Sequence, residues 1–175
     1  HTSPGQGAIL ADEMGLGKTL QTIALIATLL RQNCYFSNIR PGTVEKVLIV
    51  CPLTLVVNWK REFRKWIGRS SIGVLAVEGD GRKEVERFVS HRQYQVLILG
   101  YERLRNCVQE LSRATPGVGL VVCDEGHRLK SKDTKTTKCF DLLPTRRRIL
   151  LTGTPIQNDL REFYTMVDFV YPCLL

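Results

Sequence analysis

The chain has 175 residues, of which 43% are hydrophobic and 24% are charged, and its net charge is +8. These values are those of a globular domain with its own core, and no apolar run approaches the roughly 20 residues that span a membrane. The basic excess suits a polyanionic partner such as nucleic acid, although a solvated basic surface would explain it equally well.

Short apolar runs rich in β-branched residues alternate with helical patterns along the chain. The predicted strands are residues 8–11, 47–51, 72–77, 96–99, 119–123 and 149–151. Several of these runs are continuously apolar, as is typical of parallel strands covered on both faces. The alternation predicts an α/β fold with a mostly parallel central sheet and helices on both faces.

Three helices are predicted between and after these strands. Residues 20–30 are apolar nearly all round, which predicts a buried helix. Residues 55–67 place Trp59 and Trp66 on one apolar side, so both side chains are expected to pack in the core. The last helix starts near Leu160, with Asn158 as its N-cap. Loops are expected at residues 32–45, 78–82 and 115–117.

Six cysteines are spread along the chain without a closely spaced pair. This spacing carries no C-x-x-C metal or redox signature, so we expect reduced thiols in an intracellular protein. The chain begins at His1 without an initiator methionine or a secretory leader, which suggests a segment of a longer protein.

A glycine-rich turn joins the first predicted strand to the first predicted helix. Glycines there allow the backbone N–H groups to face phosphate oxygens, while a lysine reaches the β- and γ-phosphates and a threonine hydroxyl ligates Mg²⁺. A tight turn that merely closes a strand is the alternative, but the strand before it and the helix after it favour a phosphate site. The predicted nucleotide-binding residues are Asp12, Met14, Gly15, Leu16, Gly17, Lys18, Thr19 and Leu20.

An acidic pair follows the fifth predicted strand. We predict that Asp124, together with Thr19, holds Mg²⁺, and that Glu125 orients and deprotonates an attacking water. Adjacent carboxylates repel each other unless a cation lies nearby, which favours a metal site over a strand that simply ends in solvent.

Three segments resemble motifs I, II and III of the Swi/Snf-type ATPases, which belong to the helicase superfamily with two RecA-like lobes. They are residues 12–19 (DEMGLGKT), 124–127 (DEGH) and 151–158 (LTGTPIQN), in the family's order and spacing. Residues 124–130, 135–137 and 154–160 are most similar to the Rad-type translocases of homologous recombination. The resemblance implies that residues 1–175 form one N-terminal RecA-like lobe, a P-loop domain that binds ATP and Mg²⁺.

The same resemblance implies roles for further residues. His127 would join Lys18, Asp124 and Glu125 in the catalytic set. Motif III would couple the state of the γ-phosphate to movement on DNA through Thr152, Gly153, Thr154 and Gln157. Residues 51–59 resemble motif Ia, and residues 100–102 resemble another DNA-facing motif, although Gly100 stands where relatives more often have serine. The implied nucleic-acid contacts are Pro52, Thr54, Asn58, Tyr101 and Arg103.

Partners are also implied by the resemblance. They are double-stranded DNA, a recombinase filament or nucleosome, and a second RecA-like lobe that would follow residue 175; a membrane is not among them, and the expected location is the nucleus. That second lobe would carry an arginine finger worth about 10³ or more in rate, so the chain alone is expected to turn ATP over slowly or not at all. Basic runs at residues 130–138 and 146–148 fit a solvated face as well as a DNA contact.

Two other functions remain open at this point. RNA helicases resemble this chain, but they usually carry other residues at motifs II and III than the DEGH and TGT found here. A non-catalytic module that binds DNA or a partner is the second alternative. A vestigial nucleotide site would be expected to have lost at least one of Lys18, Thr19, Asp124 and Glu125.

Overall fold

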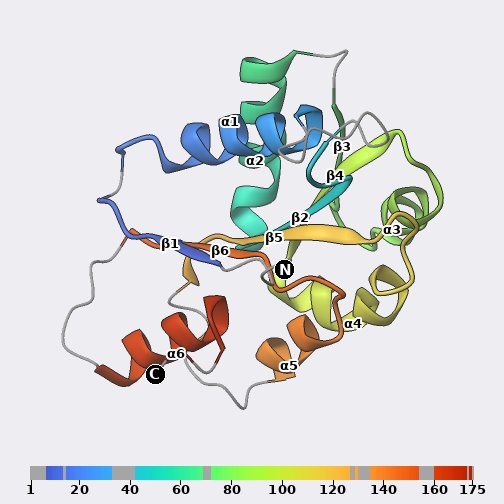
Figure 1. The fold of residues 1–175 in the computed structure, drawn as a ribbon. Coiled ribbons are helices and arrows are strands. Elements are labelled where there is room, and N and C mark those ends of the chain that lie inside the picture. Colours follow the sequence, from blue (N-terminus) through green and yellow to red (C-terminus); the bar gives the residue numbers. More distant parts are fainter. Residues whose placement is uncertain are drawn as a thin grey trace.

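Strands and helices alternate along the chain in a computed structural model, which describes residues 7–13, 15–32, 42–68, 72–126, 129, 135–153, 160–172 and 174 (Figure 1). The strands are β1 (Ala8–Leu10), β2 (Lys46–Cys51), β3 (Gly73–Ala76), β4 (Tyr94–Gly100), β5 (Val118–Cys123) and β6 (Arg148–Leu151). The helices are α1 (Lys18–Arg31), α2 (Leu53–Ile67), α3 (Arg82–Ser90), α4 (Tyr101–Leu111), α5 (Lys135–Asp141) and α6 (Leu160–Val170).

All six predicted strands form, each within two residues of the predicted bounds. Helices α3, α4 and α5 were not predicted from the sequence. In α3 the only fully buried side chains are those of Val85 and Phe88, set among charged residues, so the helical pattern is weak in isolation. Asn158, the predicted N-cap of α6, lies outside the described residues.

The strands form one sheet in the order β1-β6-β5-β2-β4-β3, and every neighbouring pair is parallel. The pairing aligns Leu10 with Leu151 and Cys51 with Gly100. Because parallel strands all run the same way, the segments that follow β1, β6, β5, β2 and β4 leave the sheet at one edge. Ligands of open α/β sheets bind outside this edge.

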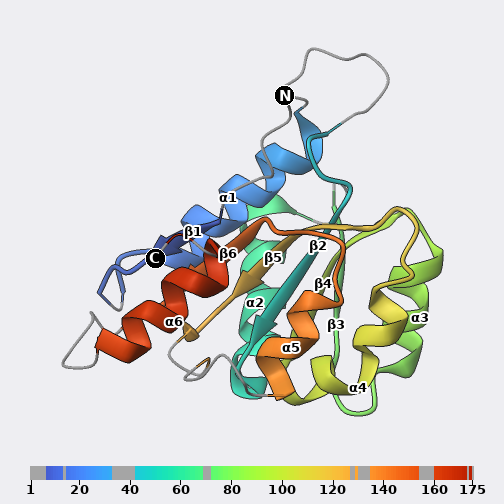
Figure 2. The ribbon, with the colours of Figure 1, turned by 60° about the horizontal axis from the view of Figure 1, so that its bottom comes forward.

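Helices cover both faces of the sheet, as predicted (Figure 2). Alternate residues of β2 face opposite sides: Val47 and Ile49 pack in the cluster that contains residues of α1 and α2, whereas Leu48 and Val50 pack in the cluster that contains residues of α3, α4, α5 and α6. All six residues of β2 are buried. The unbroken apolar run of this strand therefore follows from burial on both sides.

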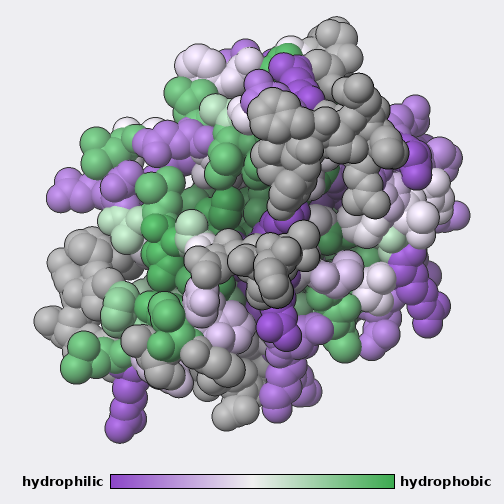
Figure 3. All heavy atoms as spheres, viewed as in Figure 1, coloured by the Kyte–Doolittle hydropathy of each residue, from purple (hydrophilic) through white to green (hydrophobic). Residues whose placement is uncertain are grey.

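The prediction that residues 20–30 form a buried helix is wrong for one side of that helix. Ile23, Ile26 and Leu30 of α1 face the sheet, but Leu20 and Leu25 are 39% and 42% exposed. In the space-filling view, hydrophobic side chains gather between α1 and the β1 edge of the sheet, whereas the surface over α3 is mainly hydrophilic (Figure 3). An apolar helix is thus buried only on the side where the sheet meets it.

Arg148 belongs to the basic run at residues 146–148, but its side chain is buried. It is therefore part of neither a solvated basic face nor a DNA-contacting surface. Its guanidinium donates to the carbonyl of Phe140 at 2.9 Å, to the carboxylate of Asp141 at 3.1 Å and to the carbonyl of Phe169 at 3.3 Å. One side chain of β6 thereby joins the ends of α5 and α6. Arg146 is exposed and remains open to either interpretation.

Cys51, Cys107, Cys123 and Cys139 are free thiols, while Cys34 and Cys173 lie outside the described residues. Burial, followed by the nearby Asp124 charge, raises the pKa of Cys51 to about 12. This thiol therefore stays protonated and acts as a small core residue. No helix among the described residues is long and apolar enough to cross a membrane.

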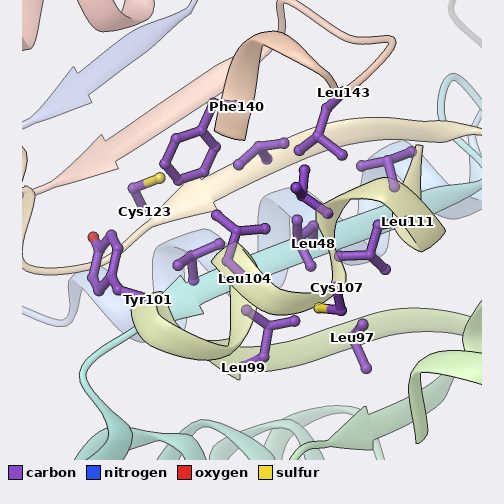
Figure 4. Packing of buried hydrophobic residues seen from close by; sticks show 14 of the residues in the cluster. Leu48, Leu97, Leu99, Tyr101, Leu104, Cys107, Leu111, Cys123, Phe140 and Leu143 are labelled. Atoms are coloured by element: carbon purple, nitrogen blue, oxygen red, sulfur yellow. The ribbon is translucent and has the colours of Figure 1, made fainter. Parts of the chain in front are cut away.

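Replacing Phe140 with alanine is expected to lower the free energy of unfolding by about 3–5 kcal/mol, because it leaves a cavity under α5. The ring is fully buried in the cluster shown in Figure 4. It packs edge to face against the ring of Phe169, and the two ring centroids are 5.0 Å apart. Urea denaturation measures the change. Leu142→Ala is the control: this side chain is 47% exposed, so its loss should cost less than about 1 kcal/mol. Equal effects of the two substitutions would contradict the assigned packing.

Candidate functional site

The turn between β1 and α1 curls around two left-handed glycines. Gly15 and Gly17 have φ angles of 90° and 79°, a region that side chains with a Cβ rarely adopt. A Cβ placed at either glycine would meet no atom within 4 Å, so the requirement for glycine is conformational and the space beside the turn is open. Gly17 is the N-cap of α1, and no side-chain cap is seen there in the described part of the chain.

The ammonium group of Lys18 lies back over the turn. It donates to the carbonyl of Asp12 at 2.6 Å and to that of Glu13 at 2.8 Å. Thr19 follows in the first turn of α1 and is partly exposed. A cation, a hydroxyl and a helix N-terminus therefore surround one open space, which is the donor set expected for a phosphate group.

Two other chain segments reach the same place because their strands lie beside β1. β6 pairs with β1, and the backbone N–H of Thr152 donates to the carbonyl of Leu10 at 3.1 Å. β5 is the next strand along, and Asp124 follows its last residue. The predicted phosphate turn, acidic pair and motif III therefore start from three adjacent strand ends.

These segments enclose a hollow of about 390 Å³. The predicted residues that line it are Gly15, Gly17, Lys18, Thr19, Leu20, Asn58, Asp124, Glu125 and Gly153. Leu55, Trp59, Glu62 and Trp66 of α2 complete its wall and were not predicted as site residues. Asp12 contributes its carbonyl to Lys18, Leu16 is exposed, and Thr152 is buried. Met14, His127, Thr154 and Gln157 lie outside the described residues.

Asp124 is held at several points. Its carboxylate accepts the indole N–H of Trp59 at 2.9 Å through Oδ2 and the Glu125 amide at 2.9 Å through Oδ1. Burial raises the pKa of this carboxyl above its usual range, while the hydrogen bonds from Trp59 and Glu125 oppose that rise. The arrangement orients a carboxylate whose charge burial disfavours, and a bound cation would complete it.

Glu125 has a φ of 54° and is the single non-glycine residue with a positive φ in the described part of the chain. This conformation costs of order 1–3 kcal/mol and persists only where the surroundings impose it. The strain falls on the residue predicted to activate water.

The two tryptophans of α2 differ from the prediction. Trp59 is 1% exposed and packs in the core as expected, but its indole also contacts Asp124, which the helical pattern did not reveal. The prediction that Trp66 is a core residue is wrong: it is 46% exposed, donates to Glu62 at 2.7 Å and lines the hollow. Trp66 lies with Glu62 on the side of α2 that faces the hollow, whereas Ile67 in the same turn packs against the core.

The predicted nucleic-acid residues do not all lie together. Asn58 lines the first hollow, and Thr54 is exposed in the first turn of α2. Pro52, Tyr101 and Arg103 line a second hollow of about 340 Å³ at the ends of β2 and β4. Tyr101 is only 9% exposed, and its hydroxyl donates to the Asp124 carbonyl at 2.7 Å, so this hydroxyl serves the acidic pair. Arg103 donates to the Gly79 carbonyl at 2.7 Å and thereby fixes the neighbouring turn.

The fold and the site together define a RecA-like P-loop domain. A family model described as the SNF2-related domain matches residues 1–175. The DNA repair and recombination protein RDH54 of Saccharomyces cerevisiae (strain YJM789) is 45% identical over 183 residues, and the DNA repair and recombination protein RAD54B of Gallus gallus is 50% identical over 169 residues. This chain belongs to the SNF2-related domain family, and its predicted likeness to the Rad-type members is confirmed.

A solved structure is similar as well. It is described as the Sulfolobus solfataricus SWI2/SNF2 ATPase core in complex with dsDNA; it superposes with a TM-score of 0.78 at 31% identity and covers 98% of this chain and 32% of that one. Both sequence alignments cover 97% of this chain, which spans about a fifth of the length of those relatives.

Replacing Trp59 with phenylalanine is expected to raise the pKa of Asp124 further in the absence of divalent metal. The substitution removes the indole donor, the strongest of the effects that oppose the rise caused by burial. NMR titration of the labelled carboxyl carbon measures the midpoint, which should move to higher pH. Trp66→Phe is the matched control, since that indole donates to Glu62. An unchanged midpoint in Trp59→Phe would contradict the hydrogen bond.

Proposed function

We propose that this chain is the ATP-binding N-terminal RecA-like lobe of a double-stranded-DNA-dependent ATPase. The parent protein would use ATP hydrolysis to ADP and phosphate to translocate along DNA, remodelling protein–DNA complexes in recombinational repair or chromatin. The observation that carries the proposal is the meeting of the phosphate turn, Asp124–Glu125 and Gly153 around one hollow. The names of the relatives agree with DNA repair and recombination. A nuclear location is part of the proposal, because DNA repair in eukaryotes acts on nuclear DNA.

The residues that line the hollow have separate proposed roles in binding phosphate, holding Mg²⁺ and activating water. The N–H groups around Gly15 and Gly17 would bind phosphate oxygens, and Lys18 would leave the carbonyls of Asp12 and Glu13 to meet the β- and γ-phosphates. Thr19 and Asp124 would hold Mg²⁺, which when bound neutralises charge on the phosphates. Glu125 would orient the attacking water and accept its proton. His127, Thr152, Thr154 and Gln157 keep their proposed roles in catalysis and coupling.

Duplex DNA is the proposed track. The second hollow, with Pro52 and Arg103, opens at the same sheet edge as the nucleotide hollow, and Thr54 is exposed beside it. Such residues suit contacts to the phosphate backbone, which position a protein without reading sequence. Binding would therefore weaken with salt and depend little on base sequence. A recombinase filament or nucleosome and a second RecA-like lobe are the further proposed partners.

Turnover of Mg-ATP by the full-length protein tests the proposal, measured without nucleic acid and with duplex DNA, single-stranded DNA or RNA. Duplex DNA is expected to stimulate turnover most, and Glu125→Gln to lower the stimulated rate by at least about 100-fold because it removes the general base. Glu110→Gln, on the exposed side of α4, removes the same charge elsewhere and is the control.

Other outcomes point to the alternative functions. Preferential stimulation by RNA would make the chain a helicase lobe for RNA and refute the DNA track. A folded protein that binds DNA but hydrolyses no ATP under any condition would refute the enzyme and support a non-catalytic module.

A further inference from the structure

The backbone of Asp124 is held by hydrogen bonds at both its N–H and its carbonyl. The Asp124 N–H donates to the carbonyl of Val50 at 2.8 Å, which continues the pairing of β5 with β2 by one residue. The Asp124 carbonyl accepts the hydroxyl of Tyr101 at 2.7 Å. A strand end is thus tied to β2 through its backbone and to α4 through a side chain.

The hydrogen bond from Tyr101 bears on the conformation of Glu125. The Asp124 carbonyl and the Glu125 nitrogen belong to the same rigid peptide plane, so a donor that fixes the oxygen also fixes the plane from which Glu125 starts. Glu125 adopts the left-handed region, with a φ of 54°. Such a conformation needs outside support, and the hydroxyl of Tyr101 holds the peptide plane that precedes it.

Tyr101 also belongs to the second hollow. It is the first residue of α4, directly after Gly100 at the end of β4, and it lines the hollow together with Pro52, Leu53 and Arg103. Figure 4 shows Tyr101 in the first turn of α4, close to Cys123 at the end of β5. One nearly buried side chain therefore touches both the wall of the second hollow and the backbone that carries Glu125.

We propose that Tyr101 is a positioning residue through which a nucleic-acid backbone in the second hollow controls the placement of Glu125. This inference rests on the proposed function, because it assigns DNA to the second hollow and water activation to Glu125. A backbone bound against Pro52, Leu53 and Arg103 would shift the start of α4. The Tyr101 hydroxyl would transmit that shift to the Asp124–Glu125 peptide and hence to the nucleotide hollow.

The test is Tyr101→Phe in the full-length protein, which removes the hydroxyl and leaves the packed ring. At saturating duplex DNA, kcat for ATP is expected to fall roughly three- to tenfold, as for the loss of one hydrogen bond. KM for ATP and Kd for DNA are expected to stay within about twofold of the wild-type values, because no contact to either ligand is removed. Tyr94→Phe, at the other end of β4 and beside a different hollow, is the matched control.

A double-mutant cycle of Tyr101→Phe and Glu125→Gln tests whether Tyr101 acts through Glu125. If Tyr101 acts through Glu125, adding Tyr101→Phe to Glu125→Gln lowers kcat no further, since the group it positions has already been changed. A purely structural tyrosine would lower the melting temperature and leave kcat unchanged at temperatures where the protein is folded.

Each contrary result has a distinct meaning. An unchanged kcat in Tyr101→Phe overturns the inference, as does weaker DNA binding with intact kcat, which would make the hydroxyl a direct DNA contact. Fully additive effects in the cycle also overturn it. Wild-type protein without DNA-stimulated turnover would instead overturn the proposed function, and that result is read before any Tyr101 variant is compared.

Discussion

The parallel pairing of β6 between β1 and β5 is the constraint on which the site depends. Residues 12–19, 124–125 and 152–153 are far apart in the sequence, yet each follows a strand of this trio. Backbone hydrogen bonds carry the register past the strand ends, from Thr152 to Leu10 and from Asp124 to Val50. The hydrogen-bond ladder between neighbouring strands fixes where each strand ends. It therefore also fixes where the phosphate turn lies relative to the acidic pair.

Burial on both faces of the sheet makes that ladder rigid. Strand residues alternate between the cluster with α1 and α2 and the cluster with the other helices, so both faces are covered at the central strands β5 and β2, whereas the edge strand β1 is partly exposed. Two polar side chains that enter this interior link separate elements: the indole of Trp59 donates to Asp124, and the terminal nitrogens of Arg148 donate to the ends of α5 and α6. The core therefore positions the site directly, because Trp59 and Tyr101 are core residues that also contact Asp124.

Much of the fold could be predicted because its signals are local. Six apolar runs and the glycine turn were recognisable in short windows, since a strand buried on both faces must be apolar throughout. Helices α3 and α5 were missed because only two positions in each are buried, and charged residues surround them. Helix α4 was overlooked, although its buried residues Leu104, Cys107, Val108 and Leu111 follow a helical spacing. The exposed face of α1 was missed because this helix is apolar nearly all round, so its sequence does not show which side faces the sheet.

The sequence by itself determined the local features that the proposed chemistry needs: glycines that permit a left-handed turn, a lysine and a threonine beside them, and a carboxylate pair after a buried run. The tertiary structure alone decided which other groups join them. The indole of Trp59, the exposed ring of Trp66 and the hydroxyl of Tyr101 reach the acidic pair or its hollow from 23 to 65 residues away. Such contacts depend on the order of strands in the sheet and the direction of each side chain, and no pattern within one segment encodes either.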